Sequence, residues 1–147
     1  MSEPRKREFF TDRDLGLRFP AALTEAGLIV HRHDDHFTQD CRDEEWLTVV
    51  GQRGWVAITF DQRIRYKPNE LSAVIDASVT LLVLVGRAKF PEQALSFIKT
   101  APVILAFLDR HVPPLIAKVY RPTERELRLN GNARGRIELW YPPTDVN

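Results

Sequence analysis

The sequence predicts an α/β fold, in which helices flank a mainly parallel five-stranded sheet that ends in a C-terminal β-hairpin. Three observations lead to this prediction. Short apolar segments of strand length alternate with amphipathic helical segments along the chain. Residues 79–85 are apolar except for one threonine, which is typical of a strand covered on both faces. Near the C-terminus, Asn130, Gly131 and Asn132 separate two strand-like runs, which is a hairpin signal.

Three strands and three helices are expected in the first part of the chain. Gly27 and Gly54 stand where two of the helices should stop, because glycine readily adopts the left-handed conformation that ends helices. Pro68 suits the first turn of the third helix, where its missing amide hydrogen costs nothing. The expected strands are residues 8–11, 28–31 and 55–60, and the expected helices are residues 15–26, 43–53 and 68–76.

The second part of the chain should contain one long helix among further strands. This helix opens at Pro91 and carries an apolar stripe as far as Leu108. Pro102 lies inside it and predicts a kink or a break, because proline cannot donate the helical hydrogen bond. We expect a main domain at residues 8–121 and a hairpin extension at residues 122–147. The expected strands are residues 78–85, 115–120, 126–129 and 136–141.

Size and composition narrow the class of protein. A chain of 147 residues is long enough for one well-packed domain but short for two. With 21 Lys and Arg against 20 Asp and Glu, the net charge is +1, so a nucleic-acid partner would need local basic patches. Cys41 is the only cysteine, which excludes an internal disulfide and indicates a reducing, cytoplasmic location. No apolar run approaches the roughly 20 residues of a membrane span, so no membrane association is expected.

Acidic residues stand where the strands of this sheet should end. Asp12 directly follows the first predicted strand and Asp61 directly follows the third. The carboxyl ends of parallel strands meet at one edge of a sheet, and binding sites form there. Asp14 is expected to act only as a helix-capping residue. Further acids follow the second strand or open the next helix: Asp34, Asp35, Asp43, Glu44 and Glu45.

Helical periodicity separates the three acids that open the helix at residues 43–53. Asp43 shares a stripe with the apolar residues Trp46, Leu47 and Val50, so its carboxylate should point inward along the sheet edge. Glu44 is intermediate. Glu45 belongs to an outward stripe, on which its side chain stays in water.

Converging carboxylates need a counter-charge, a shared proton or water between them. Two such groups about 4 Å apart repel by roughly 4 kcal/mol at an effective dielectric constant near 20. Carboxylate oxygens without His or Cys partners suit a hard cation such as Mg²⁺ or Mn²⁺. A cation held in this way, with open positions for water and phosphate oxygens, is suited to hydrolysing a phosphodiester bond.

Four segments of the chain resemble the PIN-like nucleases, and the VapC-like toxin branch in particular. The resemblance runs from about residue 8 to residue 121. It implies an Mg²⁺- or Mn²⁺-dependent ribonuclease, often the toxin of a type II toxin–antitoxin pair, with RNA as substrate and an antitoxin protein as partner. Carried over to this chain, the catalytic and metal-binding acids are Asp12, Asp43 and Asp61. The segments are FFTD at 9–12, DDHF at 34–37, DEEWL at 43–47 and GWVAITFD at 54–61.

One position departs from the family pattern. Many relatives have a second acid two residues after the Asp of the third strand, and this chain has Arg63. The departure leaves open one-metal chemistry, a replacement ligand such as Asp35 or Glu44, and a catalytically weak or inactive PIN-fold binding protein. Arg63, Arg65 and Lys67 either hold RNA phosphates or form a solvated loop.

Other functions remain as alternatives. A phospho-receiver-like signalling domain also carries acids after its first and third strands, but it requires a Ser or Thr after the fourth, where this chain has Gly86. His31, His33 and His36 could form part of a zinc site, or they could border the acidic edge as a polar loop. A homodimer is compatible with the sequence.

Overall fold

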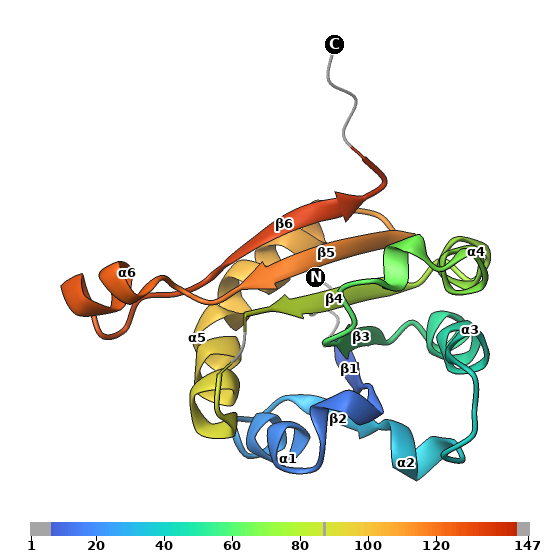
Figure 1. Ribbon diagram of the computed structural model, residues 1–147, viewed down its shortest axis with the longest axis horizontal. Helices are drawn as coiled ribbons and strands as arrows, with labels where there is room; N and C mark the ends of the chain where they lie inside the picture. Colours follow the sequence, from blue (N-terminus) through green and yellow to red (C-terminus); the bar gives the residue numbers. More distant parts are fainter. Residues whose placement is uncertain (1–6, 87, 144–147) are drawn as a thin grey trace, which may run out of the picture.

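A computed structural model describes residues 7–86 and 88–143 as one six-stranded sheet flanked by helices (Figure 1). The strand order is β2-β1-β3-β4-β5-β6; all neighbouring strands are parallel except β5 and β6, which are antiparallel. The predicted fold class is therefore confirmed. The strands are β1 Glu8–Thr11, β2 Ile29–Arg32, β3 Val56–Thr59, β4 Thr80–Val85, β5 Leu115–Tyr120 and β6 Arg136–Tyr141.

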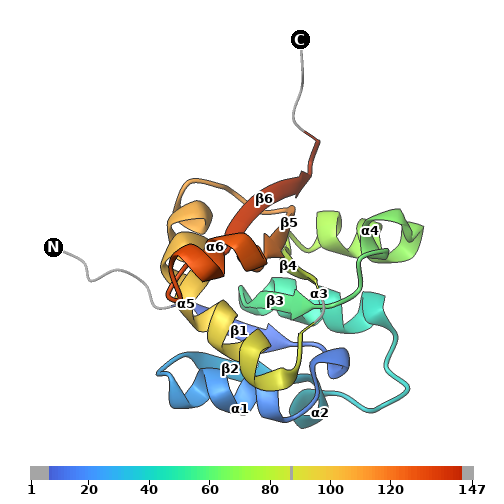
Figure 2. The same ribbon diagram turned by 60° about the vertical axis from the view of Figure 1, so that its left-hand side comes forward.

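Helices cover both faces of the sheet (Figure 2). α1 and α5 pack on the face that buries Phe9 and Ile58, whereas α3 and α4 pack on the face that buries Phe10 and Ala57. Successive strand residues thus point into opposite cores, as the pleat requires. The helices are α1 Arg18–Glu25, α2 His33–His36, α3 Asp43–Arg53, α4 Pro68–Asp76, α5 Phe90–Asp109 and α6 Glu124–Leu129, with 3₁₀ turns η1 Arg13–Leu15 and η2 Ile64–Tyr66.

Several predicted elements are confirmed to the residue, and others differ. The bounds of β1, α3, α4, β5 and β6 are those expected from the sequence. The helix expected at residues 15–26 is instead η1 followed by α1, because Gly16, with φ 68°, ends the first turn. The segment His33–His36, expected as part of a polar loop, forms the short helix α2.

Proline does not break α5. The helix runs from Phe90 to Asp109 with Pro102 inside it, so the predicted break is wrong. Pro102 lies on the exposed side of the helix. Phe97 and Ile104, before and after the proline, are both buried in the core between α5 and the sheet.

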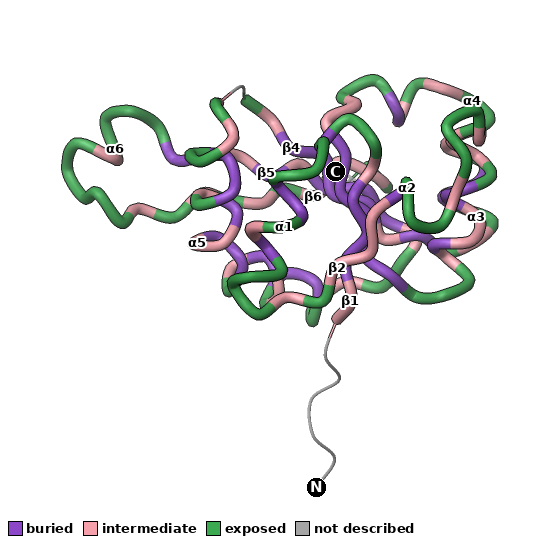
Figure 3. Tube along the Cα trace, turned by 90° about the horizontal axis from the view of Figure 1, so that it is seen from below, coloured by how far each residue is buried: buried purple, intermediate pink, exposed green. Residues whose placement is uncertain are grey.

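The C-terminal antiparallel pairing is confirmed, but its first strand is β5. Residues 126–129, expected as a strand, belong to α6. Thr123 caps this helix: its hydroxyl accepts from the Glu126 amide at 3.1 Å, and Glu126 Oε1 accepts from the Thr123 amide at 3.2 Å. This capping box stabilises the first helical turn. α6 has no buried residue and projects from the sheet (Figure 3).

Close packing fixes the direction of α3. Trp46, Leu47 and Val50 are fully buried beneath it. Gly51 faces the end of α4, where an added Cβ would lie 2.4 Å from the Ala77 carbonyl oxygen. This contact and the buried stripe fix the helix on the sheet, with its N-terminus at the carboxyl ends of β1 and β3. Within residues 7–86 and 88–143, no helix is long and apolar enough to cross a membrane.

Candidate active site

The three acids predicted as ligands line one hollow at the carboxyl ends of β1 and β3. The hollow has a volume of about 600 Å³. Asp12 follows β1, Asp61 follows β3, and Asp43 opens α3. Two further acids, Asp14 and Asp34, line the same hollow, and Asp34 lies 4.0 Å from the Nε atom of Arg13. The remaining lining residues are Arg13, His33, Gln39 and Cys41.

Thr59 joins Asp12 and Asp14. Its buried hydroxyl lies 2.9 Å from Asp12 Oδ2 and 3.1 Å from Asp14 Oδ2. Backbone amides hold both carboxylates: the Arg13 amide donates to Asp12 Oδ1 at 2.7 Å, and the Phe60 amide donates to Asp14 Oδ2 at 3.0 Å. The Asp12 amide also donates to the Ile58 carbonyl at 3.0 Å, which extends the β1–β3 pairing to this position. The two carboxylates are therefore positioned by the sheet itself.

One hydrogen has to serve two carboxylates at Thr59. A hydroxyl carries a single hydrogen, so it donates to only one of the two acids at a time. Burial and the nearby charges of Asp12 and Asp61 together raise the pKa of Asp14 to about 6, against hydrogen bonds from the Phe60 amide and the Thr59 hydroxyl that lower it. Asp14 can thus carry a proton at mildly acidic pH and donate it to Thr59 Oγ1.

Asp12 is also less acidic than an ordinary aspartic acid. Burial raises its pKa, and the charge of Asp43 adds to this, whereas the hydrogen bonds from Thr59 and Arg13 oppose it. The charge of Asp61 acts in the same direction on Asp14. Mutual repulsion therefore links all four acids, so the hollow favours a cation or a bound proton.

Asp43 points inward, as its place on the buried stripe predicts. Its Oδ1 accepts a hydrogen bond from the indole Nε1 of Trp46 at 2.9 Å, and the side chain is partly buried. Glu45 is exposed, and its Oε2 lies 3.5 Å from the Cys41 sulfur. The first turn of α3 thus turns one carboxylate toward the hollow and another toward solvent.

Lys67 pairs with Asp61. Its Nζ lies 2.6 Å from Asp61 Oδ2, and the Arg63 amide donates to Oδ1 at 3.0 Å. The Asp61 amide donates to Thr59 Oγ1 at 3.1 Å. Asp61 therefore already has a cationic partner, whereas among the described residues Asp12, Asp14 and Asp43 form no ion pair with Lys or Arg.

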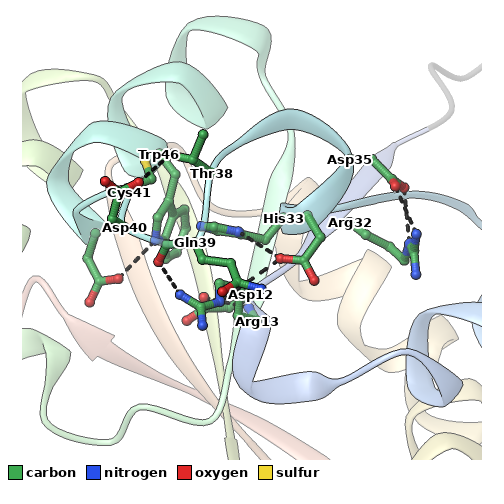
Figure 4. A network of polar contacts seen from close by, with 12 residues as sticks. Asp12, Arg13, Arg32, His33, Asp35, Thr38, Gln39, Asp40, Cys41 and Trp46 are labelled. Atoms are coloured by element: carbon green, nitrogen blue, oxygen red, sulfur yellow. Dashed lines mark hydrogen bonds and ion pairs between the residues drawn. The ribbon is translucent and has the colours of Figure 1, made fainter.

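Asp35 and Glu44, the predicted reserve ligands, do not line the hollow. Asp35 accepts two hydrogen bonds from Arg32, at 2.8 and 3.0 Å, and this pairing lowers its pKa. Figure 4 shows the pair apart from Asp12. Glu44 lines a different depression between α3 and α4, with Arg42 3.8 Å away.

Of the histidines near the acidic edge, His33 lines the hollow and His31 packs on Trp55. His33 borders the hollow; it is 2% exposed, and its Nδ1 lies 3.5 Å from Asp34 Oδ1. His31 stacks on Trp55, with ring centroids 3.8 Å apart, and bonds Glu8 at 3.0 Å. His33 and His31 are thus engaged in contacts within the protein, and neither the zinc site nor the polar-loop interpretation is decided by them.

A family profile described as a PIN-like domain matches residues 7–86. The chain belongs to the PIN-like family. The matched segment runs from β1 to the end of β4 and contains Asp12, Asp14, Asp43 and Asp61. PIN-like domains are a nuclease-type fold that generally depends on divalent metals. No curated protein and no solved structure matches the chain.

The donor chemistry of the hollow fits a hard cation that keeps part of its water shell. In the described part of the chain, no three His, Cys, Asp or Glu side chains are gathered closely enough to hold a metal ion by themselves. The acids of the hollow supply only oxygen ligands. Mg²⁺ is commonly bound by one or two carboxylates together with several waters. Asp12 and Asp43, which have no cationic side chain bonded to them, suit that mode of binding.

Sequence reasoning missed Asp14 and Thr59. Asp14 was expected only to cap a helix, but its carboxylate bonds the Phe60 amide and Thr59 hydroxyl across the sheet edge. The spacing of Asp12 and Asp14, two residues apart after a strand, was the available signal. No local pattern indicates Thr59, because its partner Asp14 lies 45 residues away.

Proposed function

We propose that this protein is an Mg²⁺- or Mn²⁺-dependent endoribonuclease that hydrolyses RNA phosphodiester bonds. The convergence of Asp12, Asp14, Asp43 and Asp61 on one hollow of about 600 Å³ carries this proposal. Membership of a nuclease-type family supports it.

Asp12 and Asp43 would bind the cation, Asp61 would act on it through its water shell, and Asp14 and Thr59 would keep Asp12 in place. When bound, the cation would polarise a phosphate oxygen and lower the pKa of an attacking water. The hydrogen bond from Trp46 orients Asp43, and the amide of Arg13 orients Asp12. Such fixed ligands cost little reorganisation during the reaction.

The basic residues after β3 would hold the RNA backbone. Arg63, Arg65 and Lys67 follow Asp61 within six positions, so phosphates bound there would lie beside the scissile bond. Phosphate contacts supply most of the sequence-independent affinity for nucleic acids.

A cleavage assay with a structured and an unstructured RNA tests the proposed activity. Wild-type protein should cleave RNA with Mg²⁺ or Mn²⁺ and not with EDTA or Ca²⁺. The matched control is Asp12→Asn, which keeps the size of the side chain and removes its charge. Equal cleavage by both proteins would contradict the assignment of the hollow.

A second candidate is a catalytically weak or inactive PIN-fold binding protein. The 2.6 Å contact between Lys67 and Asp61 favours it, because the ammonium group stands where a cation would bind. In that case Lys67→Gln should raise the metal affinity measured by Mn²⁺ titration and create cleavage that the wild type lacks. Under the first proposal, Lys67→Gln weakens RNA binding and the wild type is already active.

We further propose that the protein is the toxin of a type II toxin–antitoxin pair acting in the cytoplasm. An antitoxin would bring an Arg or Lys to the carboxylates of the hollow and compete with the metal. Expression alone should slow growth, and co-expression of the adjacent gene should relieve it. If wild type and Asp61→Asn are equally harmless, the toxin role is wrong.

A further inference from the structure

A cluster of cationic and aromatic side chains lies on the face of β5 and β6 opposite α5. We name it the cation–aromatic surface. β5 and β6 form one edge of the sheet (Figure 1). Ile137 and Leu139 of β6 pack toward α5, whereas Trp140 and Tyr141 both pack toward the opposite core. A register shift between β5 and β6 after the Ala117–Leu139 pair interrupts the alternation of the pleat there. The cluster consists of Arg65 and Tyr66 from η2, Lys118 from β5, and Trp140 and Tyr141 from β6.

Ring contacts hold the cations of this surface in place. Lys118 Nζ lies 4.2 Å from the centre of the Trp140 ring. The guanidinium carbon of Arg65 lies 5.6 Å from the Trp140 ring, 5.8 Å from the Tyr66 ring and 6.0 Å from the Tyr141 ring. Tyr66 meets Trp140 edge-on, at 5.6 Å and 79°. The geometry is that of cation–π pairs, which order long flexible side chains.

Tyr66 contacts the Trp140 ring but remains largely exposed to solvent. The residue is 70% exposed, whereas Arg65, Lys118 and Trp140 are partly buried. Within residues 7–86 and 88–143, neither Arg65 nor Lys118 forms an ion pair. Glu138 is the register partner of Lys118, but its ion pair is with Arg136, at 3.4 Å. The surface therefore offers an accessible ring beside two cations whose charge is not neutralised.

The loop that ends at Lys67 joins this surface to the acidic hollow. Asp61 and Lys67 contact one another, while Arg65 and Tyr66 between them contact β6. Arg65 lies four positions after Asp61, so their Cα atoms are at most about 14 Å apart. A ligand a few nucleotides long can touch both places.

We propose that the cation–aromatic surface binds single-stranded RNA, with an unpaired base stacked on Tyr66 and phosphates held by Arg65 and Lys118. This inference rests on the proposed function, which makes RNA the ligand. Stacking on an exposed ring beside a positively charged groove is how proteins bind single strands without reading their sequence. Lys118, Trp140 and Tyr141 lie beyond the residues that match the family profile, so the surface adds to what the family membership describes.

Fluorescence anisotropy in EDTA measures this binding without cleavage. The probe is a labelled twelve-nucleotide oligouridine, and the competitor is a duplex RNA of equal length. Tyr66→Ala should weaken binding of the single strand by at least about fivefold, because one base stack is lost. Tyr66→Phe keeps the ring and should bind within about twofold of wild type. Leu129→Ala, an 81% exposed residue of α6, is the matched control and should bind as wild type.

Two results would overturn the inference. One is unchanged oligouridine binding by Tyr66→Ala, which would leave the surface as a site for a protein partner. The other is an equal loss of single-strand and duplex binding, since a duplex has no free base to stack. Lys118→Gln gives a second test. Because it removes a charge that would contact phosphate, oligouridine affinity should depend less steeply on salt concentration. It remains informative if Tyr66→Ala is poorly folded.

The outcome is separable from that of the proposed function. Protein that binds oligouridine through Tyr66 but never cleaves RNA would contradict the nuclease and support this surface. If the wild type cleaves RNA and Tyr66→Ala binds oligouridine normally, the nuclease is supported and the RNA-binding surface is contradicted.

Discussion

The acidic hollow and the cation–aromatic surface lie at the two ends of one short loop and differ in every physical respect. The hollow gathers five aspartates, of which Asp61 pairs with Lys67 and Asp34 lies near Arg13. The surface gathers two cations with no carboxylate partner among the described residues. Burial, and after it the charges of neighbouring aspartates, raise the pKa of Asp12 and Asp14 in the hollow, whereas Arg65 and Lys118 of the surface contact aromatic rings. The difference indicates that chemistry and affinity reside in separate groups of residues.

The two regions are also built differently. Backbone amides and a buried hydroxyl fix the carboxylates of the hollow, so small displacements there should be costly. Ring contacts hold Arg65 and Lys118 less rigidly, and such contacts contribute roughly 0.5–1 kcal/mol each at exposed sites. Substitutions in the hollow should therefore change the rate of cleavage, and those on the surface should change RNA affinity.

Neutralising either strand-end acid should have the largest effect. Asp12→Asn and Asp61→Asn should each lower the cleavage rate by about a thousandfold or more, because metal assistance supplies several kcal/mol and each 1.36 kcal/mol is tenfold. Oligouridine affinity in EDTA should stay the same or rise, since a negative charge near the phosphates is removed. Melting temperatures in EDTA should hold or rise as well. If cleavage rate and oligouridine affinity both fall, the acidic hollow also contributes to RNA binding, and the two regions do not have separate roles.

The first turn of α3 should give the next largest effect. Asp43→Asn should lose at least about a hundredfold in cleavage at saturating Mg²⁺, because it removes a proposed ligand. Glu45→Gln, two residues away and exposed, should change the rate by less than about fivefold. Both substitutions keep the length of the side chain. If Glu45 is essential and Asp43 dispensable, the inward orientation of Asp43 has no catalytic meaning.

Two arginines of the same loop should differ in RNA binding. Arg65→Gln and Arg63→Gln each remove one positive charge. Each should reduce the slope of log affinity against log salt concentration by up to about one. Only Arg65 of the two contacts aromatic rings, three in number. Arg65→Gln should therefore weaken oligouridine binding a few-fold more than Arg63→Gln does. Equal losses in anisotropy titrations would mean that the loop acts through charge alone.

The smallest effect should be a pH-dependent change in stability at Asp14. Its pKa is about 6 in the folded protein against 3.8 for an ordinary aspartic acid, so the folded state holds the proton more tightly. Its contribution to stability therefore falls as the pH rises from about 4 to 6, and stays low above that range.

Asp14→Asn removes this penalty. It should raise the melting temperature in EDTA by a few degrees at pH 7.5 and by less at pH 4.5. Thermal melts at the two pH values measure the difference. An equal shift at both would show that the charge of Asp14 is not responsible.

Local patterns were sufficient for most of the fold. The apolar stripe of α3, its closing Gly54 and the Pro68 that opens α4 are short-range signals, and the structure has these helices where the sequence predicts them. Residues 126–129 were predicted as a strand, and this was wrong: Thr123 and Glu126 form a capping box that begins helix α6.

The sequence by itself determined that the acids after β1 and β3 would meet, though not that Asp14 would join them, because parallel strands place their carboxyl ends at one edge whatever the side-chain details. It indicated Asp12, Asp43 and Asp61 in this way. Only the tertiary structure decided their partners: Thr59 bridging Asp12 and Asp14, Lys67 on Asp61, and Trp140 under Lys118. Bonds such as Thr59–Asp14 and Lys118–Trp140 join residues far apart in the chain. Their geometry depends on how strands and helices pack, which no local pattern encodes.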